Sequence, residues 1–453
     1  MHMRFVFAAA LLIGGLVSCV PPMESAPITA QEDALTVQDV LQIIRGANLF
    51  EHETFDGNDR TCATCHVGQD GFALSIERVQ AEWALDPSAS LFRAPDSDSL
   101  DGASYDMLRE DGLVRVHVTL APNVRVLDPV DGVNVQIRPD GRYIVAMRRA
   151  TPSSVNSALT QHLMWDGREG ASLSHQAGSA ISEHAGGRAP TQDEADAIAV
   201  FQRTLFSSPQ LARYAYTGID PTLPRGRTAS ERRGRAFFES GPLSGSAGTH
   251  GLCATCHSGP MLNRTNAFNP GDPPDLAFSG NRTSEFNSAG LPTHTYEITA
   301  AADIVNDNPL VGPPGVVLWP AGTVFHTTTP DPGALVVDTD PSDGDDDPSN
   351  PCISVTACFV VPGTAIVFHR IPTLWGIRHT APYFHDNSAA TLEDAAAHYV
   401  DFFGPTRASM LAQADAMEAI GQIEIAAALR DQAAALVITE QDVLDIAAFM
   451  RLL

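Results

Sequence analysis

The sequence is poor in positive charge and has no long apolar run beyond its N-terminus. Its 453 residues include 28 basic residues, all of them arginine, against 54 Asp and Glu, so the formal net charge is −26 at pH 7. This balance argues against nucleic acid and against an anionic membrane surface as partners. No later segment has about 18 uninterrupted apolar residues, so we expect no transmembrane body. The remaining composition, 44% hydrophobic and 18% charged, is ordinary for a soluble globular protein.

The N-terminus has the layout of an export signal. Met1–Arg4 is short and basic, and Phe5–Val17 is apolar but too short to span a bilayer. The residues Leu-Val-Ser-Cys that end at Cys19 resemble a bacterial lipobox. We therefore expect residues 1–19 to be a lipoprotein signal peptide with lipid on Cys19, and residues 20–34 to be a tether. This predicts a periplasmic protein held at the outer membrane by its lipid alone; the alternative is an ordinary signal peptide with a chance cysteine.

Cysteine is scarce, and four of the seven cysteines belong to two copies of one pattern, Cys-Ala-Thr-Cys-His, at residues 62–66 and 253–257. Cys-x-x-Cys-His is the attachment signature of c-type haem. The predicted haem-attaching residues are Cys62, Cys65, Cys253 and Cys256, and the predicted proximal iron ligands are His66 and His257. A single copy could also be a redox dithiol or half a zinc site. Two identical copies in an exported chain favour two covalent haems and a redox function.

The two cysteines that remain, Cys352 and Cys358, lie six positions apart. In an oxidising periplasm, a local disulfide is the simplest use for them. The alternative is two free thiols.

The two halves of the chain repeat each other beyond the haem motifs. A segment that looks like the helix before the haem in a class I cytochrome c stands ahead of both motifs. Pro152 is followed 13 positions later by Trp165, Pro372 is followed 13 positions later by His385, and an aspartate comes next in both. We therefore predict a mainly α fold of two class I cytochrome c-like domains.

Two insertions interrupt this repeat. Val114–Met147 is rich in Val, Ile and Arg and contains Asp-Gly turn signals, which favours strands. We assign residues 35–225 to an N-terminal haem domain with a β-rich insertion at 78–148. Residues 226–453 form the predicted C-terminal haem domain, with an irregular insertion at 268–362 that is rich in Pro, Gly and Asp.

Through these motifs the chain resembles the bacterial di-haem cytochrome c peroxidases and their relative MauG. The resemblance covers roughly residues 38–265 and 365–453. It is most specific in Thr151–Asn156, Trp165–Arg168, Arg370–Leu374 and Thr380–Asp386. It implies that the first haem reacts with peroxide, that the second haem receives electrons, and that Trp165 relays electrons between them. The alternative for Trp165 is a plain core aromatic residue.

The resemblance also implies how the sixth position of each iron is used. Family peroxidases place a methionine 19 positions after the threonine of the T-x-P-Y-F-H-D motif, where this chain has Tyr399, as MauG-type members do. Tyr399 is thus the predicted axial ligand of the second haem, and a phenolate should lower its potential; the alternative is Met410 or another residue. The first haem is expected to be five-coordinate. The alternative is that His117 or His162 is a sixth ligand of its iron.

Peroxide cleavage also needs an acid–base group above the open iron. The family uses a Gln and a Glu after its W-D-G-R motif. Gln176 matches the first, but the place of the glutamate falls on or near Gly186. Glu183 and His184 stand nearby, and we give them equal weight as substitutes or as surface residues.

A Ca²⁺ ion lies between the domains of family peroxidases, bound by an asparagine and by the backbone of the T-x-P segment. Ala150 occupies the place of the asparagine here, whereas Thr380 and Pro382 remain. The calcium site is therefore expected to be altered or absent.

The leading hypothesis is a periplasmic peroxidase that reduces H₂O₂ with electrons from a small redox protein, either a cytochrome c or a cupredoxin. A MauG-like oxidase, which modifies a protein or peptide side chain through a bis-ferryl state, is the close alternative because of Tyr399. A third hypothesis is a non-catalytic electron carrier with both irons saturated.

Overall fold

The computed structural model describes residues 36–99, 104–160, 162–241, 250–264, 278–282, 291–299, 304–305, 317–331, 333 and 366–453. The predicted signal peptide, the tether and the residues Cys19, Cys352 and Cys358 lie outside these ranges. Across these described residues the fold is mixed, 44% helical and 14% strand, with small antiparallel sheets. Helix predominates, while the division into two cytochrome c-like domains stays a prediction. No helix in the described ranges is both long and apolar enough to cross a membrane.

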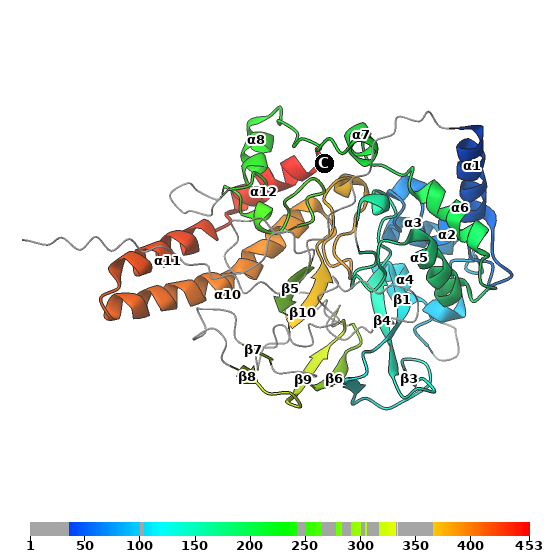
Figure 1. Cartoon of the computed structure of the whole chain (residues 1–453), viewed down its shortest axis with the longest axis horizontal. Coiled ribbons are helices and arrows are strands. Elements are labelled where there is room, and N and C mark those ends of the chain that lie inside the picture. The colour runs from blue at the N-terminus through cyan, green and yellow to red at the C-terminus, as the bar shows by residue number, and fades with distance from the viewer. Residues whose placement is uncertain are drawn as a thin grey trace, which may run out of the picture.

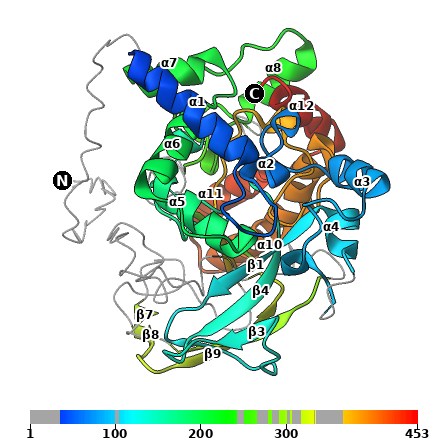
Figure 2. The same ribbon diagram turned by 90° about the vertical axis from the view of Figure 1, so that its right-hand side faces the viewer.

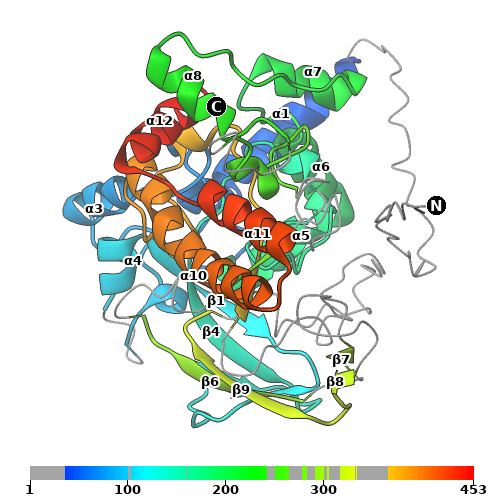
Figure 3. The same cartoon turned by 90° about the vertical axis from the view of Figure 1, so that its left-hand side faces the viewer.

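Most of the described helices lie in the upper part of the molecule as drawn in Figure 1, while most of the strands lie below them. The helices are α1 (Val37–His52), α2 (Cys62–Cys65), α3 (Ile76–Leu85), α4 (Asp106–Asp111), α5 (Leu173–Ala180), α6 (Gln192–Gln202), α7 (Pro209–Thr217), α8 (Ala229–Ala236), α10 (Leu392–Ala419), α11 (Ile423–Ala435) and α12 (Glu440–Met450). The short segments are η1 (Gly68–Asp70), η2 (Ala94–Asp96), η3 (Ser157–Leu159), η6 (Cys253–Thr255), η10 (Ile377–His379) and the π-helical turn η4 (Ile181–Ala185). Helices α10 and α11 lie side by side and project from one end of the molecule (Figures 1 and 3).

Strands gather below the helices as small antiparallel sheets. Within the described ranges these are β1 (Leu113–Thr119), β4 (Tyr143–Ala150) and β3 (Val135–Ile137); β2 (Val124–Val126), β6 (His294–Thr299) and β9 (Val324–Thr329); β10 (Ile366–Arg370) with β5 (Phe278–Arg282); and β7 (Ile304–Val305) with β8 (Val317–Trp319). Because β2 pairs with β6, the insertions of the two halves share one sheet. The first part of the insertion at 78–148, however, is helical, since α3 and α4 occupy it.

Helices α1 and α6 cross closely on one side of the molecule (Figure 2). Each begins at a threonine whose side chain caps the first turn in a reciprocal capping box. The closest approach is at Gly46, where an added Cβ would lie 1.9 Å from the carbonyl oxygen of Ala197. Only a residue without a side chain fits there.

Helices α8 and α12 repeat this arrangement in the second half (Figure 3). An added Cβ at Gly234 would lie 1.8 Å from the carbonyl oxygen of Asp445. The buried carboxylate of Asp445 accepts from the guanidinium of Arg233, with an Nε–Oδ2 distance of 2.6 Å. The same glycine-mediated crossing therefore stands ahead of each Cys-x-x-Cys-His motif.

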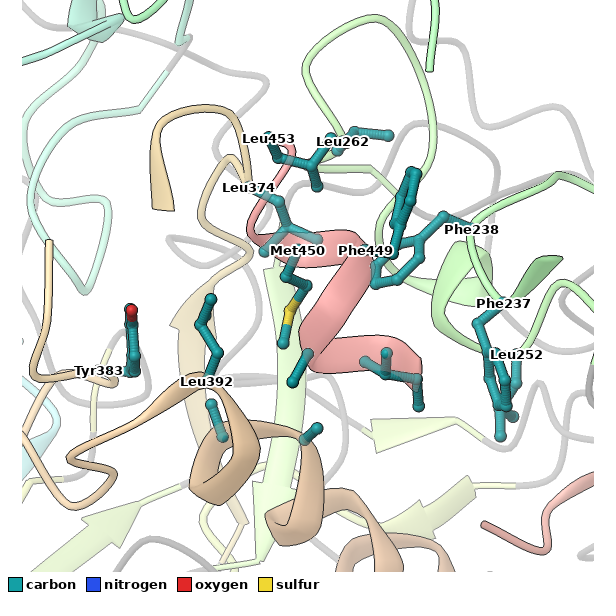
Figure 4. Close-up of a cluster of buried hydrophobic side chains, with 14 of the residues drawn as sticks. Phe237, Phe238, Leu252, Leu262, Leu374, Tyr383, Leu392, Phe449, Met450 and Leu453 are labelled. Atoms are coloured by element: carbon teal, nitrogen blue, oxygen red, sulfur yellow. The ribbon is translucent and has the colours of Figure 1, made fainter. Parts of the chain in front are cut away.

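The core of the second half is aromatic and aliphatic (Figure 4). The rings of Phe238, just after α8, and Phe449, in α12, lie 5.2 Å apart between centroids. Leu252, next to the second haem motif, and Met450 belong to the same buried cluster. Burial of this apolar surface holds the helix pair against the second motif.

Isolated backbone bridges show the repeat most directly. One bridge closes the loop after each Cys-x-x-Cys-His motif, and another closes each of the loops that carry Trp165 and His385. The four bridges are Val67–Ala73, Ser258–Arg264, Leu163–Glu169 and Tyr383–Ala389. The offsets within each kind of loop are identical, so the repeat seen in the sequence is also a repeat of backbone conformation.

The two halves are joined by reciprocal hydrogen bonds. The N–H of Ala150, at the end of β4, donates to the carbonyl of His385 at 2.6 Å. The N–H of Arg370, at the end of β10, donates to the carbonyl of Trp165 at 2.9 Å. Each strand thus ends against the loop of the other half.

Candidate functional site

Residues of both halves line one cavity of about 700 Å³. Its lining includes the two motif histidines, His66 and His257, together with Trp165 and Tyr399. Most of the lining is apolar, as is common for cofactor sites. The cavity therefore brings together residues that the sequence singled out separately.

The first motif follows α1 and occupies α2. The ring Nδ1 of His66 lies 2.9 Å from the carbonyl oxygen of Phe72 and 3.1 Å from the hydroxyl of Ser154. A backbone carbonyl at Nδ1 fixes the tautomer with the proton on that nitrogen and leaves the lone pair of Nε2 for a metal. His66 is thus prepared as a ligand.

The second motif repeats this contact. Nδ1 of His257 lies 2.8 Å from the carbonyl oxygen of Leu262. Burial lowers the pKa of His257, as it does for His66, so both rings are neutral at pH 7. Neutral imidazole with a free Nε2 is the form that binds haem iron.

The motif thiols do not have the properties of a redox dithiol. Burial raises the pKa of Cys62 to about 12 and that of Cys65 to about 11, and it also raises the pKa of Cys253. Reactive dithiols have a lowered pKa instead. The pKa values of these three thiols are therefore not those of a reactive dithiol, and haem attachment stays the prediction from the motifs.

Arg370 supplies a cation at the cavity wall. Its Nε donates to the carbonyl of Met164 at 3.1 Å, while its buried Nη1 has no hydrogen-bond partner among the described residues. Burial lowers the pKa of Arg370 to about 10, so it stays charged at pH 7. A buried guanidinium without a full set of partners suits a carboxylate such as a haem propionate. The cavity, its two histidines and this arginine fit two c-type haems.

Trp165 lines the cavity, and its indole Nε1 donates to the carbonyl of Ala150 at 2.8 Å. The same Ala150 bonds through its N–H to His385 of the other half. The indole ring is therefore fixed at the junction of the two halves. The resemblance to di-haem peroxidases predicts an electron relay at this place. The role of Trp165 as a relay stays a prediction.

An ion-pair network begins at Asp166, the residue that follows Trp165. Asp166 pairs with Arg149 at 2.5 Å and with Arg168 at 3.0 Å, and Arg149 also pairs with Asp331 at 2.6 Å. Burial alone would raise the pKa of Asp166, but the two arginines outweigh it and hold the pKa at about 2. The network fixes the loop that carries Trp165.

The acid–base candidates occupy different places. Gln176 and His184 line the cavity, whereas Glu183 does not. The carboxylate oxygen Oε2 of Glu183 lies 3.5 Å from Nη2 of Arg168 and 3.9 Å from Nε2 of His184. Burial lowers the pKa of His184, and Glu183 opposes that shift. A neutral imidazole in the cavity can accept a proton, so the geometry favours His184.

Tyr399 lies in α10 and lines the cavity with Cys253, Cys256 and His257. Burial raises the pKa of its phenol, and the nearby Cys256 raises it further. The second motif and Tyr399 thus share one part of the cavity, as an axial ligand requires. Coordination to iron would have to displace the phenol proton.

The competing ligands and the calcium residues are also placed. His117 bonds to the carbonyl of Val133 at 3.1 Å, and neither it nor His162 nor Met410 lines the cavity. Thr380 and Pro382 do line it, with the Thr380 hydroxyl donating to Ile377 at 3.1 Å. The calcium site stays a prediction.

Sequence reasoning missed three residues of this region: Met164, Arg149 and Arg370. Met164 lines the cavity, and the amide of Gln176 lies 4.0 Å from its sulfur. Its position next to Trp165 was the available signal. Arg149 is the next-to-last residue of β4, directly before Ala150, and Arg370 is the last residue of β10. Ala150 and Arg370 donate the two backbone hydrogen bonds that join the halves.

A scan against protein-family models finds no match for the chain, and a search of the curated proteins finds none. Among solved structures, the chain is similar to one described as a MauG-like protein associated with microbial copper homeostasis. The alignment covers 93% of this chain and 89% of that one, at 17% identity and a TM-score of 0.40.

Proposed function

We propose that this chain is a di-haem oxidoreductase that reduces hydrogen peroxide to water. The observation that carries the proposal is that His66 and His257, the histidines of two haem-attachment motifs, line one cavity together with Trp165. Transfer of one electron at a time needs only one haem, whereas two haems close to Trp165 would suit a two-electron reaction. When bound, the haems supply the two electrons that convert H₂O₂ and two protons into two molecules of water.

The residues around the first motif have distinct tasks in this proposal. His66 would hold the iron through Nε2, because its Nδ1 is engaged by the carbonyl oxygen of Phe72. His184 accepts a proton from the inner oxygen of peroxide and returns it to the outer oxygen, which leaves as water. Gln176 orients the peroxide through its side-chain amide. Glu183 tunes His184 from outside the cavity, since it lies beside the ring at 3.9 Å.

The second half receives electrons in this proposal. Tyr399 and His257 would together hold the iron of the second haem, which would leave the first haem to react with peroxide. The donor is a small redox protein such as a cytochrome c or a cupredoxin, and the net charge of −26 favours a basic or neutral donor surface. Periplasmic location and a lipid anchor at Cys19 belong to the same proposal.

A second candidate function is supported by Tyr399 itself. A phenolate stabilises oxidised iron better than a thioether does. That preference suits a MauG-like oxidase, which holds both oxidising equivalents long enough to modify a protein or peptide side chain. Slow turnover with reduced cytochrome c and a long-lived oxidised spectrum after one equivalent of H₂O₂ would favour this candidate.

The test is a steady-state assay with H₂O₂ and reduced cytochrome c on matched variants. His184→Gln should slow the peroxide reaction by about 10²–10⁴-fold, the usual contribution of an acid–base group, while Glu183→Gln should slow it less than about tenfold. Equal losses, or none, would contradict the role of His184. Two low-spin EPR signals without any reaction with peroxide would contradict both enzyme proposals and leave the electron carrier.

A further inference from the structure

A cluster of three metal-binding side chains lies outside the haem-attachment motifs. Asp331 follows β9, His369 is in β10, and His385 is in the loop equivalent to that of Trp165. One ligand atom from each lies within 4.8 Å of the other two. We propose that Asp331, His369 and His385 bind a divalent transition metal ion of the Zn²⁺ class.

The distances suit such an ion. Nε2 of His369 lies 3.7 Å from Oδ2 of Asp331, and Nε2 of His385 lies 4.0 Å from the same oxygen. Ligand bonds of about 2.0–2.2 Å in a tetrahedral site put neighbouring ligand atoms about 3.3–3.6 Å apart. Small side-chain movements are therefore enough to close the site.

All three residues are buried: Asp331 is 3% exposed, His369 7% and His385 5%. The two imidazole rings stack with centroids 4.0 Å apart. Two imidazoles and a carboxylate in so small a volume carry a large desolvation cost, which a bound cation would offset.

Arg149 is the competitor for Asp331. Its Nε and Nη2 lie 2.6 and 2.8 Å from Oδ2 and Oδ1, and the N–H of Gly333 also donates to Oδ1. A carboxylate has about four acceptor positions, two on each oxygen. Oδ2, the oxygen nearest both histidines, accepts one guanidinium bond from Arg149, so a metal ion would take the side of this oxygen that faces His369 and His385. The charge of Arg149 is itself balanced by Asp166, at 2.5 Å.

The donor set indicates the class of metal. Imidazole nitrogens suit zinc, copper, nickel and iron, whereas Ca²⁺ and Mg²⁺ prefer sites made entirely of oxygen. Three protein ligands leave a fourth position open. His369 and His385 also line the cavity. The ion would tie the chain after β9 to β10 and to the loop that bonds Ala150.

Zinc retention by the holoprotein tests the proposal. The protein with both haems is stripped with EDTA, incubated with Zn²⁺ alone, desalted and analysed for zinc against haem iron by mass spectrometry. Wild type should retain about one zinc per chain. His369→Gln and His385→Gln should bind zinc at least about 100-fold more weakly, since even loss of an outer partner costs 10–100-fold.

His326→Gln is the matched control, because His326 is a more exposed histidine that pairs with Glu297 at 3.3 Å. It should retain as much zinc as wild type. Zinc should also raise the Tm of wild type and not that of the two cluster variants. The proposal is overturned if stripped wild type retains no zinc, or if His369→Gln and His385→Gln, with native haem spectra, retain as much as wild type. Neither result depends on activity with peroxide.

Discussion

Replacing Arg149 by methionine should destabilise this protein more than any surface arginine substitution. The Arg149 side chain is 2% exposed and bonds two carboxylates that are 0% and 2% exposed. Its loss leaves Asp166 with Arg168 alone and removes both guanidinium bonds from Asp331. Breaking a buried pair by removing one partner costs about 3–5 kcal/mol, because a charge stays buried without compensation.

The pKa of Asp166 shows how strongly Arg149 and Arg168 together stabilise this carboxylate in the folded state. Arg149 and Arg168 hold the pKa at about 2, against an ordinary value of 3.8. Each pKa unit corresponds to about 1.4 kcal/mol, so this carboxylate alone contributes about 2.5 kcal/mol in the folded state. That contribution is present above the unfolded pKa and is lost as the pH falls through the folded pKa, between about pH 4 and pH 2. Asp331 adds to it, since Arg149 also lowers its pKa.

The assay is urea unfolding of the holoprotein, followed by far-UV circular dichroism in EDTA so that no added ion shields Asp331. Arg188→Met is the control, because Arg188 forms a comparable two-bond pair with Glu194 at the surface, with both bonds at 2.8 Å. It should lose far less, since exposed pairs are screened by water. In the Arg149→Met background, Asp331→Asn should recover at least about 1 kcal/mol. If Arg149→Met costs no more than Arg188→Met, the network does not hold the loop of Trp165.

Four further substitutions test other parts of the molecule. Trp165→Phe leaves the Ala150 carbonyl without its 2.8 Å donor, so it should cost about 1–3 kcal/mol in urea unfolding and slow electron transfer between the haems in stopped-flow spectra. Tyr399→Phe should change the low-spin haem spectrum, and an unchanged spectrum would remove Tyr399 as a ligand. Gly234→Ala should cost about 1–3 kcal/mol through overpacking against Asp445. Gly178→Ala, where an added Cβ meets nothing within 4 Å, should instead stabilise α5; a loss there would contradict the packing argument.

The sequence could predict the motifs and the repeat because both depend on local spacing. Haem attachment needs two thiols and a histidine within five residues, and the bridges around Trp165 and His385 repeat the spacing found in the sequence. The helical start of the insertion at 78–148 was also predictable. Ser75 caps α3 by accepting from the N–H of Arg78, which is a local signal that the β-rich pattern further on obscured.

Tertiary features could not be predicted in this way. Glu183 and His184 are adjacent, and the π-helical turn of residues 181–185 decides which of them faces the cavity. A π turn holds more residues than an α turn, so it rotates the side chains that follow relative to an ordinary helix. The meeting of Asp331 with His369 and His385 depends on β9, β10 and a loop that are far apart in the sequence. No local pattern encodes such a meeting.

The repeat separates residues that support the fold from residues that carry the chemistry. Positions that are identical in both halves, such as Gly46 and Gly234, serve helix packing, which each half needs equally. Trp165 and His385 occupy equivalent loops but differ, and each loop is held by the strand end of the other half. The shared frame fixes where these two rings lie, so their difference is available for function. An indole there suits electron transfer, while an imidazole beside His369 and Asp331 suits a metal ion.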